Sequence, residues 1–442
     1  MVYFLNYTRL LAVPPVRPIP TLSKDLIIEI LIRVPVKSLV QSQLVCKAWL
    51  SLINHPAFVK SQLRHALSTQ PHVISPKVIK HETFSLLDVD SRQIVAHLKF
   101  PRPRGEVTSV TIVGSANGIV CVAVQFKTTF PVRITDIYLW NPAMRQSKLL
   151  PSLFDYESAD ILSLRALGFG YDEVDHDFKV VVFGVLFPLG TCYAVYSDYR
   201  NAWRHISLPE PIRAIRAGTF DVCVNGFLCG MRNKYVMMSF DLNQEVLNCA
   251  IKFPVMNLAH AQHFRNCAAK LPVINDDNDH DYELDGEITH VIAFNNSVAV
   301  VMLMESNKKI NFWTLDDGTT CLRGRGLEAS WTPMLSIVLT IPASLIYGYF
   351  SNGNLQLAVV MNDVKMLVSC NADKKEARIA PLSVKMADDL HNRVIFKYTE
   401  SLVSLQGFTD MSAKTTNVGK YSKPLLVLVS LCCLLFFNLS FS

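Results

Sequence analysis

The sequence lacks the motifs that mark most enzyme active sites. It has no G-x-S-x-G nucleophile motif, no H-E-x-x-H zinc motif, no P-loop and no dinucleotide fingerprint. Its 11 cysteines are scattered, without a C-x-x-C pair or a Cys/His cluster at zinc-ligand spacing. We therefore expect no catalytic residue, no metal and no cofactor.

Charge is sparse as well. Charged residues make up 18% of the 442 residues, and the net charge of +6 is not gathered into a Lys/Arg run such as a nucleic-acid groove needs. Nucleic acid is therefore not an expected partner. Cys121, Cys229 and Cys249 lie inside apolar runs, as buried thiols do, which favours a reducing compartment, the cytoplasm or the nucleus. Residues 1–20 lack a signal-peptide pattern, and their prolines predict a loose extension.

Two acidic clusters are the remaining candidates for chemistry. In residues 276–287 the aspartates begin like a calcium loop, but Tyr282 replaces the required Gly and Ile288 replaces the final Glu. A solvated loop is the better interpretation. The second cluster consists of Asp172, Asp175, His176 and Asp177. We expect a turn between strands there, with a catalytic carboxylate–histidine pair as the less favoured alternative.

Residues 22–58 predict a compact hook of three short helices. Ser23 is a suitable N-cap, and Asp25 suits the positive end of the first helix. The apolar residues of this helix recur at i, i+3, i+4 and i+7: Ile27, Ile30, Leu31 and Val34. Such short helices cannot bury all their apolar side chains by themselves, so part of the stripe must meet a partner or another domain.

The amino-acid sequence of this hook resembles the F-box of plant F-box proteins, most specifically in VPVKSL (residues 34–39) and VCKAW (residues 45–49). The resemblance implies that the hook binds the Skp-family adaptor of a cullin-based SCF ubiquitin ligase. The implied adaptor-binding residues are Leu22, Leu26, Ile27, Ile30, Leu31, Pro35 and Leu39. The expected core of the hook consists of Val34, Val45, Trp49 and Leu52.

From about Thr83 to Leu405, helical periodicity gives way to short apolar or alternating runs, which predict strands. The expected strands include residues 107–113, 118–124, 134–140, 178–185, 193–196, 222–228, 236–242, 291–304, 355–360 and 365–369. NGIVC at residues 117–121 is echoed by NGFLC at residues 225–229, each a hairpin turn feeding a strand. Spacings of roughly 50 to 70 residues between such marks suit the four-stranded blades of a β-propeller.

The same region is similar to the F-box-associated domain of plant F-box proteins. The similar segments, in the family's order, are residues 114–118, 140–142, 168–172, 195–197, 224–226, 239–241 and 330–331. Some members of that family are described as kelch-repeat proteins, but this sequence has no Gly-Gly dipeptide, so a literal kelch propeller is not expected. Pro333 also replaces a basic residue common in the family, which leaves open whether a strand forms there. We expect Trp140, Trp203, Trp313 and Trp331 to pack between blades rather than to form a binding platform.

Residues 425–441 are 17 uncharged residues preceded by Lys420 and Lys423. At about 1.5 Å per residue they reach the lower limit of a membrane-spanning helix, so a tail anchor is one interpretation. An element packed on the β domain is the other.

We therefore predict an α+β multidomain protein: a small N-terminal three-helix F-box, then an all-β propeller-like domain and a hydrophobic C-terminal tail. The expected boundaries are a loose extension at 1–20, the F-box at 21–64, a connector and first strands at 65–110, the propeller-like domain at 111–405, a polar spacer at 406–423 and the tail at 424–442. The expected function is target recognition for a ubiquitin ligase, without catalysis. The alternative is a β-propeller enzyme or carbohydrate-binding protein that uses the β domain directly.

Overall fold

The computed structural model divides into two units, up to Ser61 and from Gln62 to Thr415, and the boundary falls inside helix α4. It describes residues 23–69, 72–76, 83–88, 93–101, 106–126, 135–153, 161–187, 190–207, 220–231, 236–253, 287–304, 309–316, 318–324, 329–338, 343–351, 354–361, 364–371, 376–381 and 396–410. The predicted acidic loop at 276–286 and the apolar tail lie outside these residues. No helix in the described ranges is long and apolar enough to span a bilayer.

The N-terminal unit begins with the predicted short helices, α1 (Lys24–Ile32), α2 (Val36–Ser42) and α3 (Lys47–Ile53). The hydroxyl of Ser23 accepts a hydrogen bond from the amide of Leu26, so the predicted N-cap is confirmed. The expectation of only three helices is wrong, because α4 (Pro56–Thr69) follows. Pro56 ends α3 but is itself the first residue of α4, a position where the missing N–H costs nothing.

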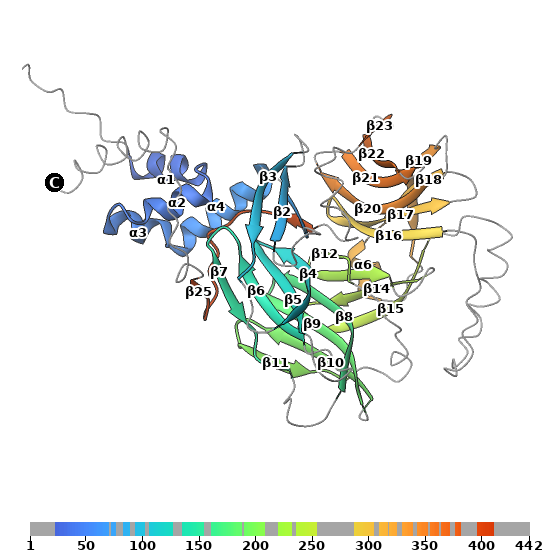
Figure 1. Cartoon of the computed structure of the whole chain (residues 1–442), viewed down its shortest axis with the longest axis horizontal. Coiled ribbons are helices and arrows are strands. Elements are labelled where there is room, and N and C mark those ends of the chain that lie inside the picture. The colour runs from blue at the N-terminus through green and yellow to red at the C-terminus, as the bar shows by residue number, and fades with distance from the viewer. Residues whose placement is uncertain are drawn as a thin grey trace, which may run out of the picture. The chain divides into compact units, whose positions relative to one another are not determined.

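In its described residues, the larger unit contains six antiparallel sheets, which we call blades 1 to 6 (Figure 1). Blades 1 to 3 contain β24 (Phe396–Tyr398), β1 (His72–Pro76), β2 (Thr83–Asp88) and β3 (Ile94–Lys99); β4 (Val107–Ala116), β5 (Ile119–Phe126), β6 (Thr135–Asn141), β7 (Gln146–Leu149) and β25 (Thr409–Asp410); and β8 (Ile161–Asp172), β9 (Asp177–Phe187), β10 (Gly190–Ser197) and β11 (Ala202–His205).

Blades 4 to 6 contain β12 (Val222–Val224), β13 (Phe227–Met231), β14 (Val236–Asp241) and β15 (Val246–Lys252); β16 (Glu287–Phe294), β17 (Ser297–Met304), β18 (Lys309–Leu315) and β19 (Trp331–Val338), with the short helix α6 (Gly318–Leu322) before β19; and β20 (Ala343–Ser351), β21 (Asn354–Met361), β22 (Val364–Asn371) and β23 (Glu376–Pro381). In blades 2 to 6 the connections after the first and third strands lie at one end, because neighbouring strands are antiparallel. We call it the turn end.

Successive blades are held together by apolar clusters that both blades share. Five such clusters join blades 1–2, 2–3, 3–4, 4–5 and 5–6. In β9, Val180 and Val182 face the blade 2–3 cluster, whereas Val181 and Phe183 face the blade 3–4 cluster. Burial of both faces explains why these strands appear in the sequence as continuous apolar runs.

Two of the segments expected as single strands are each divided by a turn, and the turn at Asn225-Gly226 is one that the sequence also predicts. Residues 222–228 form β12 and the start of β13, and residues 291–304 lie in β16 and β17. The breaks fall at Asn225 and Asn295, which have φ of 49° and 51°, the conformation that a tight hairpin turn requires. Pro333 does lie in a strand, β19, the outermost strand of blade 5, where the ladder is irregular and a missing N–H is tolerated.

The described chain ends by joining blades 1 and 2. Strand β24 pairs with β1, so one sheet contains strands from both ends of the domain. Residues 399–410, which we call the C-terminal strap, then cross to blade 2, where β25 pairs with β7. The boundaries expected at 111 and 405 therefore fall inside the propeller, since its strands run from His72 to Asp410.

The strap is fastened to the turn end of blade 2. The amide of Asn141 donates to the carbonyl oxygens of Ser401 (3.1 Å) and Val403 (2.7 Å), and the Ser401 hydroxyl donates to Asn117 O (2.9 Å). Gly118 lies directly under Ser401: a Cβ at this position would be 2.0 Å from Ser401 Oγ. Only a glycine therefore fits beneath the strap.

Replacing Gly118 with Ala should destabilise the propeller far more than replacing Gly226 with Ala. Both glycines have positive φ, +84° and +79°, but a Cβ at Gly226 meets nothing within 4 Å. Each variant pays roughly 1–2 kcal/mol for the left-handed backbone. Gly118→Ala should lose about 1–3 kcal/mol more by pushing the strap away. Urea unfolding of both variants checks this, and equal losses would show that the strap is not fastened at Gly118.

Candidate functional site

The predicted adaptor-binding residues differ widely in exposure. Leu26 and Ile30, one turn apart on α1, have 52% and 53% of their surface exposed, and Pro35 is also exposed. Ile27 is half-buried, and Leu31 and Leu39 are buried. Leu22 lies outside the described residues. An apolar pair that is free to meet a partner is therefore present on α1.

The expected core residues of the hook are also unequal. Trp49 is buried, whereas Val34, Val45 and Leu52 are only half-buried. Sequence periodicity missed three further buried residues, Val36, Ile53 and Phe58. Ile53 lies at i+4 from Trp49, so the buried stripe of α3 extends one position beyond Leu52.

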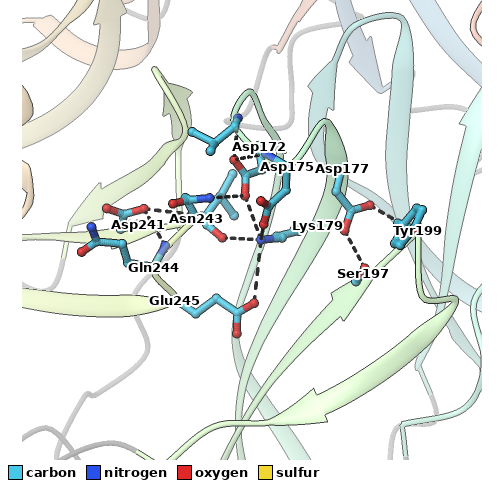
Figure 2. Close-up of polar contacts among 12 residues, drawn as sticks. Asp172, Asp175, Asp177, Lys179, Ser197, Tyr199, Asp241, Asn243, Gln244 and Glu245 are labelled. Atoms are coloured by element: carbon cyan, nitrogen blue, oxygen red, sulfur yellow. Dashed lines mark hydrogen bonds and ion pairs between the residues drawn. The ribbon is translucent and has the colours of Figure 1, made fainter.

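At the turn end of blade 3 the structure gathers most of the second predicted polar cluster (Figure 2). Asp172 and Asp177 close the β8–β9 hairpin as a paired position, so the predicted turn between strands is confirmed. The buried ammonium group of Lys179 lies 2.8 Å from Asp172 and 3.5 Å from Asp175. His176 lies in the turn with φ of 53° and stacks on Tyr171 instead of joining the carboxylates.

Lys179 also reaches blade 4. Its ammonium group donates to the carbonyl oxygen of Leu242 at 2.7 Å and lies 3.8 Å from the Glu245 carboxylate, which in turn pairs with Arg204. Asn243 donates from its amide to Asp172. The cluster therefore connects blade 3 to blade 4, which is a structural role.

The turns around Lys179 are held by buried carboxylates. Asp172 accepts hydrogen bonds from the amides of Val174 and Asp175, and Asp177 accepts from the amide of Tyr199 and the Ser197 hydroxyl. In the same way, Asp241 accepts from the amides of the β14–β15 turn. Each carboxylate satisfies donors that a tight turn leaves without a backbone partner.

Burial opposes ionisation of Asp172 and by itself would raise the pKa. The hydrogen bond from Lys179, the two backbone amides and the charge of Lys179 outweigh burial, so the pKa of Asp172 lies below its ordinary value. The carboxylate is therefore ionised at neutral pH and is not suited to act as a general acid there.

A second buried lysine makes the equivalent link between blades 2 and 3. Lys148 on β7 pairs with Asp198 in the β10–β11 turn at 2.8 Å, and both side chains are at most 10% exposed. Sequence reasoning missed Lys148 and gave no role to Lys179. For Lys179 the available signal was a lysine directly before an apolar run, DFKVVVF (residues 177–183), since an unpaired charge is rarely buried. Lys148 follows the polar residues Gln146 and Ser147, so the sequence around it carries no such signal.

The tryptophans pack between blades, as expected. Trp140 is buried in the blade 1–2 cluster, and Trp313 and Trp331 pack against the blade 4–5 cluster. Trp203 and Trp331 also donate from their indole N–H to the carbonyl oxygens of Pro151 and Lys252, at the outer edge of the preceding blade. The described residues contain no group of three or more Cys, His, Asp or Glu placed to hold a metal ion.

Comparison with known proteins gives two family matches. The F-box domain matches residues 19–61, and the F-box associated beta propeller domain matches residues 72–320. A protein of Arabidopsis thaliana named as an F-box protein is 31% identical over 206 residues, covering 45% of this chain and 51% of that protein. Two further relatives from the same plant are an F-box/kelch-repeat protein (28% over 234 residues, 49% and 61%) and the F-box protein CPR1 (30% over 201 residues, 42% and 45%). The chain spans about half the length of these curated relatives.

Asp172→Asn should destabilise the propeller much more than Asp175→Asn. The first leaves Lys179 buried beside a neutral amide, which costs about 3–5 kcal/mol. The second removes a carboxylate that is 57% exposed and more distant, at a cost of about 1 kcal/mol or less. Chemical denaturation of both variants measures the difference.

The ion pair between Asp172 and Lys179 also predicts how the stability of the propeller depends on pH. Since the folded-state pKa of Asp172 is lowered, its contribution to stability is complete above the ordinary aspartate pKa of about 4 and is lost as the pH falls below it. The stability gap between wild type and Asp172→Asn should therefore narrow between about pH 5 and pH 2. A gap that does not change over this range would contradict the assignment.

Proposed function

Since this chain belongs to the F-box proteins that carry an F-box associated β-propeller domain, we propose that it is the substrate-recognition subunit of an SCF-type ubiquitin ligase. The hook binds the Skp-family adaptor, and the propeller binds the target protein. The chain itself performs no covalent step. It raises the effective concentration of target lysines near the conjugating enzyme, which other subunits recruit.

The observation that carries this proposal is the exposed pair Leu26 and Ile30 on α1. Two large aliphatic side chains, each about half exposed, lie at i and i+4 on a short capped helix in the matched F-box. Burying them against a partner is favourable by roughly 25 cal/mol per Å² of apolar surface. The adaptor-binding set is then Leu22, Leu26, Ile27, Ile30 and Pro35 at the interface. Leu31 and Leu39, which are buried, support it from beneath.

The cluster around Lys179 supports a receptor over the alternative of a propeller enzyme. Its carboxylates are occupied by backbone amides and a lysine, and they tie turns and blades together. A rigid scaffold with function in its loops is the usual division of labour in such domains.

Ile30→Asp should abolish co-purification of the Skp-family adaptor, because a carboxylate would be buried in an apolar interface without a partner. Leu67→Asp is the matched control: Leu67 is 44% exposed on α4, outside the predicted set. Leu31→Asp is unsuitable, since Leu31 is buried and its loss would unfold the hook. Co-expression and size-exclusion chromatography provide the measurement. If Ile30→Asp retains the adaptor at wild-type stoichiometry, the proposal fails.

A further inference from the structure

Two apolar side chains protrude from the turn end of blade 3. Val174 in the β8–β9 turn is 72% exposed, and Tyr199 in the β10–β11 turn is 87% exposed. Among the large apolar side chains described in the propeller, these are the two most exposed. Neither contributes much to packing, so the fold gives no reason for an apolar residue at either position.

The two turns are fixed and tied together. Asp172 holds the amide of Val174 at 3.0 Å, and Asp177, at the other end of the same turn, holds the amide of Tyr199 at 2.9 Å. Both carboxylates are buried. Figure 2 shows Asp177 reaching toward Ser197 and Tyr199, on the side away from Lys179. The backbone of Val174 and Tyr199 is thus already ordered before any partner binds, so binding there would cost little conformational entropy in these two turns.

Positive charge accompanies Tyr199. Arg200 in the same turn is exposed, and so is Arg145 in the β6–β7 turn of blade 2. The ion pair between Lys148 on β7 and Asp198 in the β10–β11 turn connects blade 2 to the turn that contains Tyr199. Within the part of the chain that the structure describes, neither guanidinium is in a salt bridge. The nearby carboxylates of Asp177 and Asp198 are buried and already bonded. The exposed acids, Glu173 and Asp175, lie beside Val174 instead.

We propose that the β8–β9 and β10–β11 turns of blade 3 form a docking surface for an acidic segment of a target protein. An apolar side chain of the segment packs on Tyr199 and Val174, and its carboxylates pair with Arg200 and Arg145. Tyr and Arg are the residues that most often dominate binding energy at interfaces. This inference rests on the proposed function, because it locates the target on the receptor.

The test uses the full chain co-purified with its adaptor and two fluorescent 12-residue peptide pools. One pool places Asp or Glu around a central Leu or Phe, and the other places Lys or Arg around the same centre. The wild type should bind the acidic pool at least tenfold more tightly than the basic pool, and the preference should weaken as salt rises.

Three variants make the test specific. Tyr199→Ala should lower affinity for the acidic pool about tenfold, and Arg200→Glu should shift the preference toward the basic pool. Val95→Ala, at a residue 51% exposed on β3 in blade 1, should change nothing. All three sites are exposed, so an unchanged melting temperature verifies folding.

Adaptor co-purification by the same variants separates this inference from the proposed function. If Tyr199→Ala binds the acidic pool as the wild type does, or if the wild type shows no preference for that pool, the docking surface is overturned while adaptor binding stands. Loss of the adaptor from wild-type chain would instead count against the proposed function.

Discussion

Burial of both faces of the sheets in blades 2 to 5 is the constraint on which this structure depends. A blade that packs on one side only would leave half of its apolar side chains in water. In β5, alternate residues serve the blade 1–2 and blade 2–3 clusters, and the first six residues are all buried. Blades are therefore stable only as a series, and the polar features of the domain are placed where they do not interrupt that packing.

The two buried lysines show how a charged side chain can lie between packed blades. Lys148 and Lys179 lie at successive blade junctions, and each is paired with an aspartate about 2.8 Å away. A buried ion pair is a weak source of net stability, because desolvation offsets much of the attraction. Its geometry is nevertheless demanding. We interpret these pairs as devices that fix the lateral position of one blade on the next, which apolar contacts alone leave loosely defined.

Sequence reasoning succeeded where local chemistry decides the outcome. The Ser23 cap and the Asn-Gly turns follow from backbone requirements that only a few residue types meet. It did not include β8 (ILSLRALGFGYD) among the expected strands, and this segment contains two glycines, Gly168 and Gly170. At Gly168 a Cβ would approach Leu228 to 2.6 Å, so the glycine serves close contact between blades and the strand continues through it. The Lys179 links to Leu242 and Glu245 depend on residues more than 60 positions away, and no local pattern contains them.

The position of strand β24 near the end of the described chain has a consequence for protein synthesis. The helices of the hook leave the ribosome more than 300 residues before Phe396 and Tyr398, which complete the first blade. Domains generally fold as units while the chain emerges, so the hook can form long before the propeller is able to close. A chain that stops short of residue 396 would carry a helical hook beside an incomplete set of blades. Under the proposed function, such a fragment would occupy the adaptor without a complete target-binding domain. The position of β24 thus makes completion of the propeller depend on nearly complete translation.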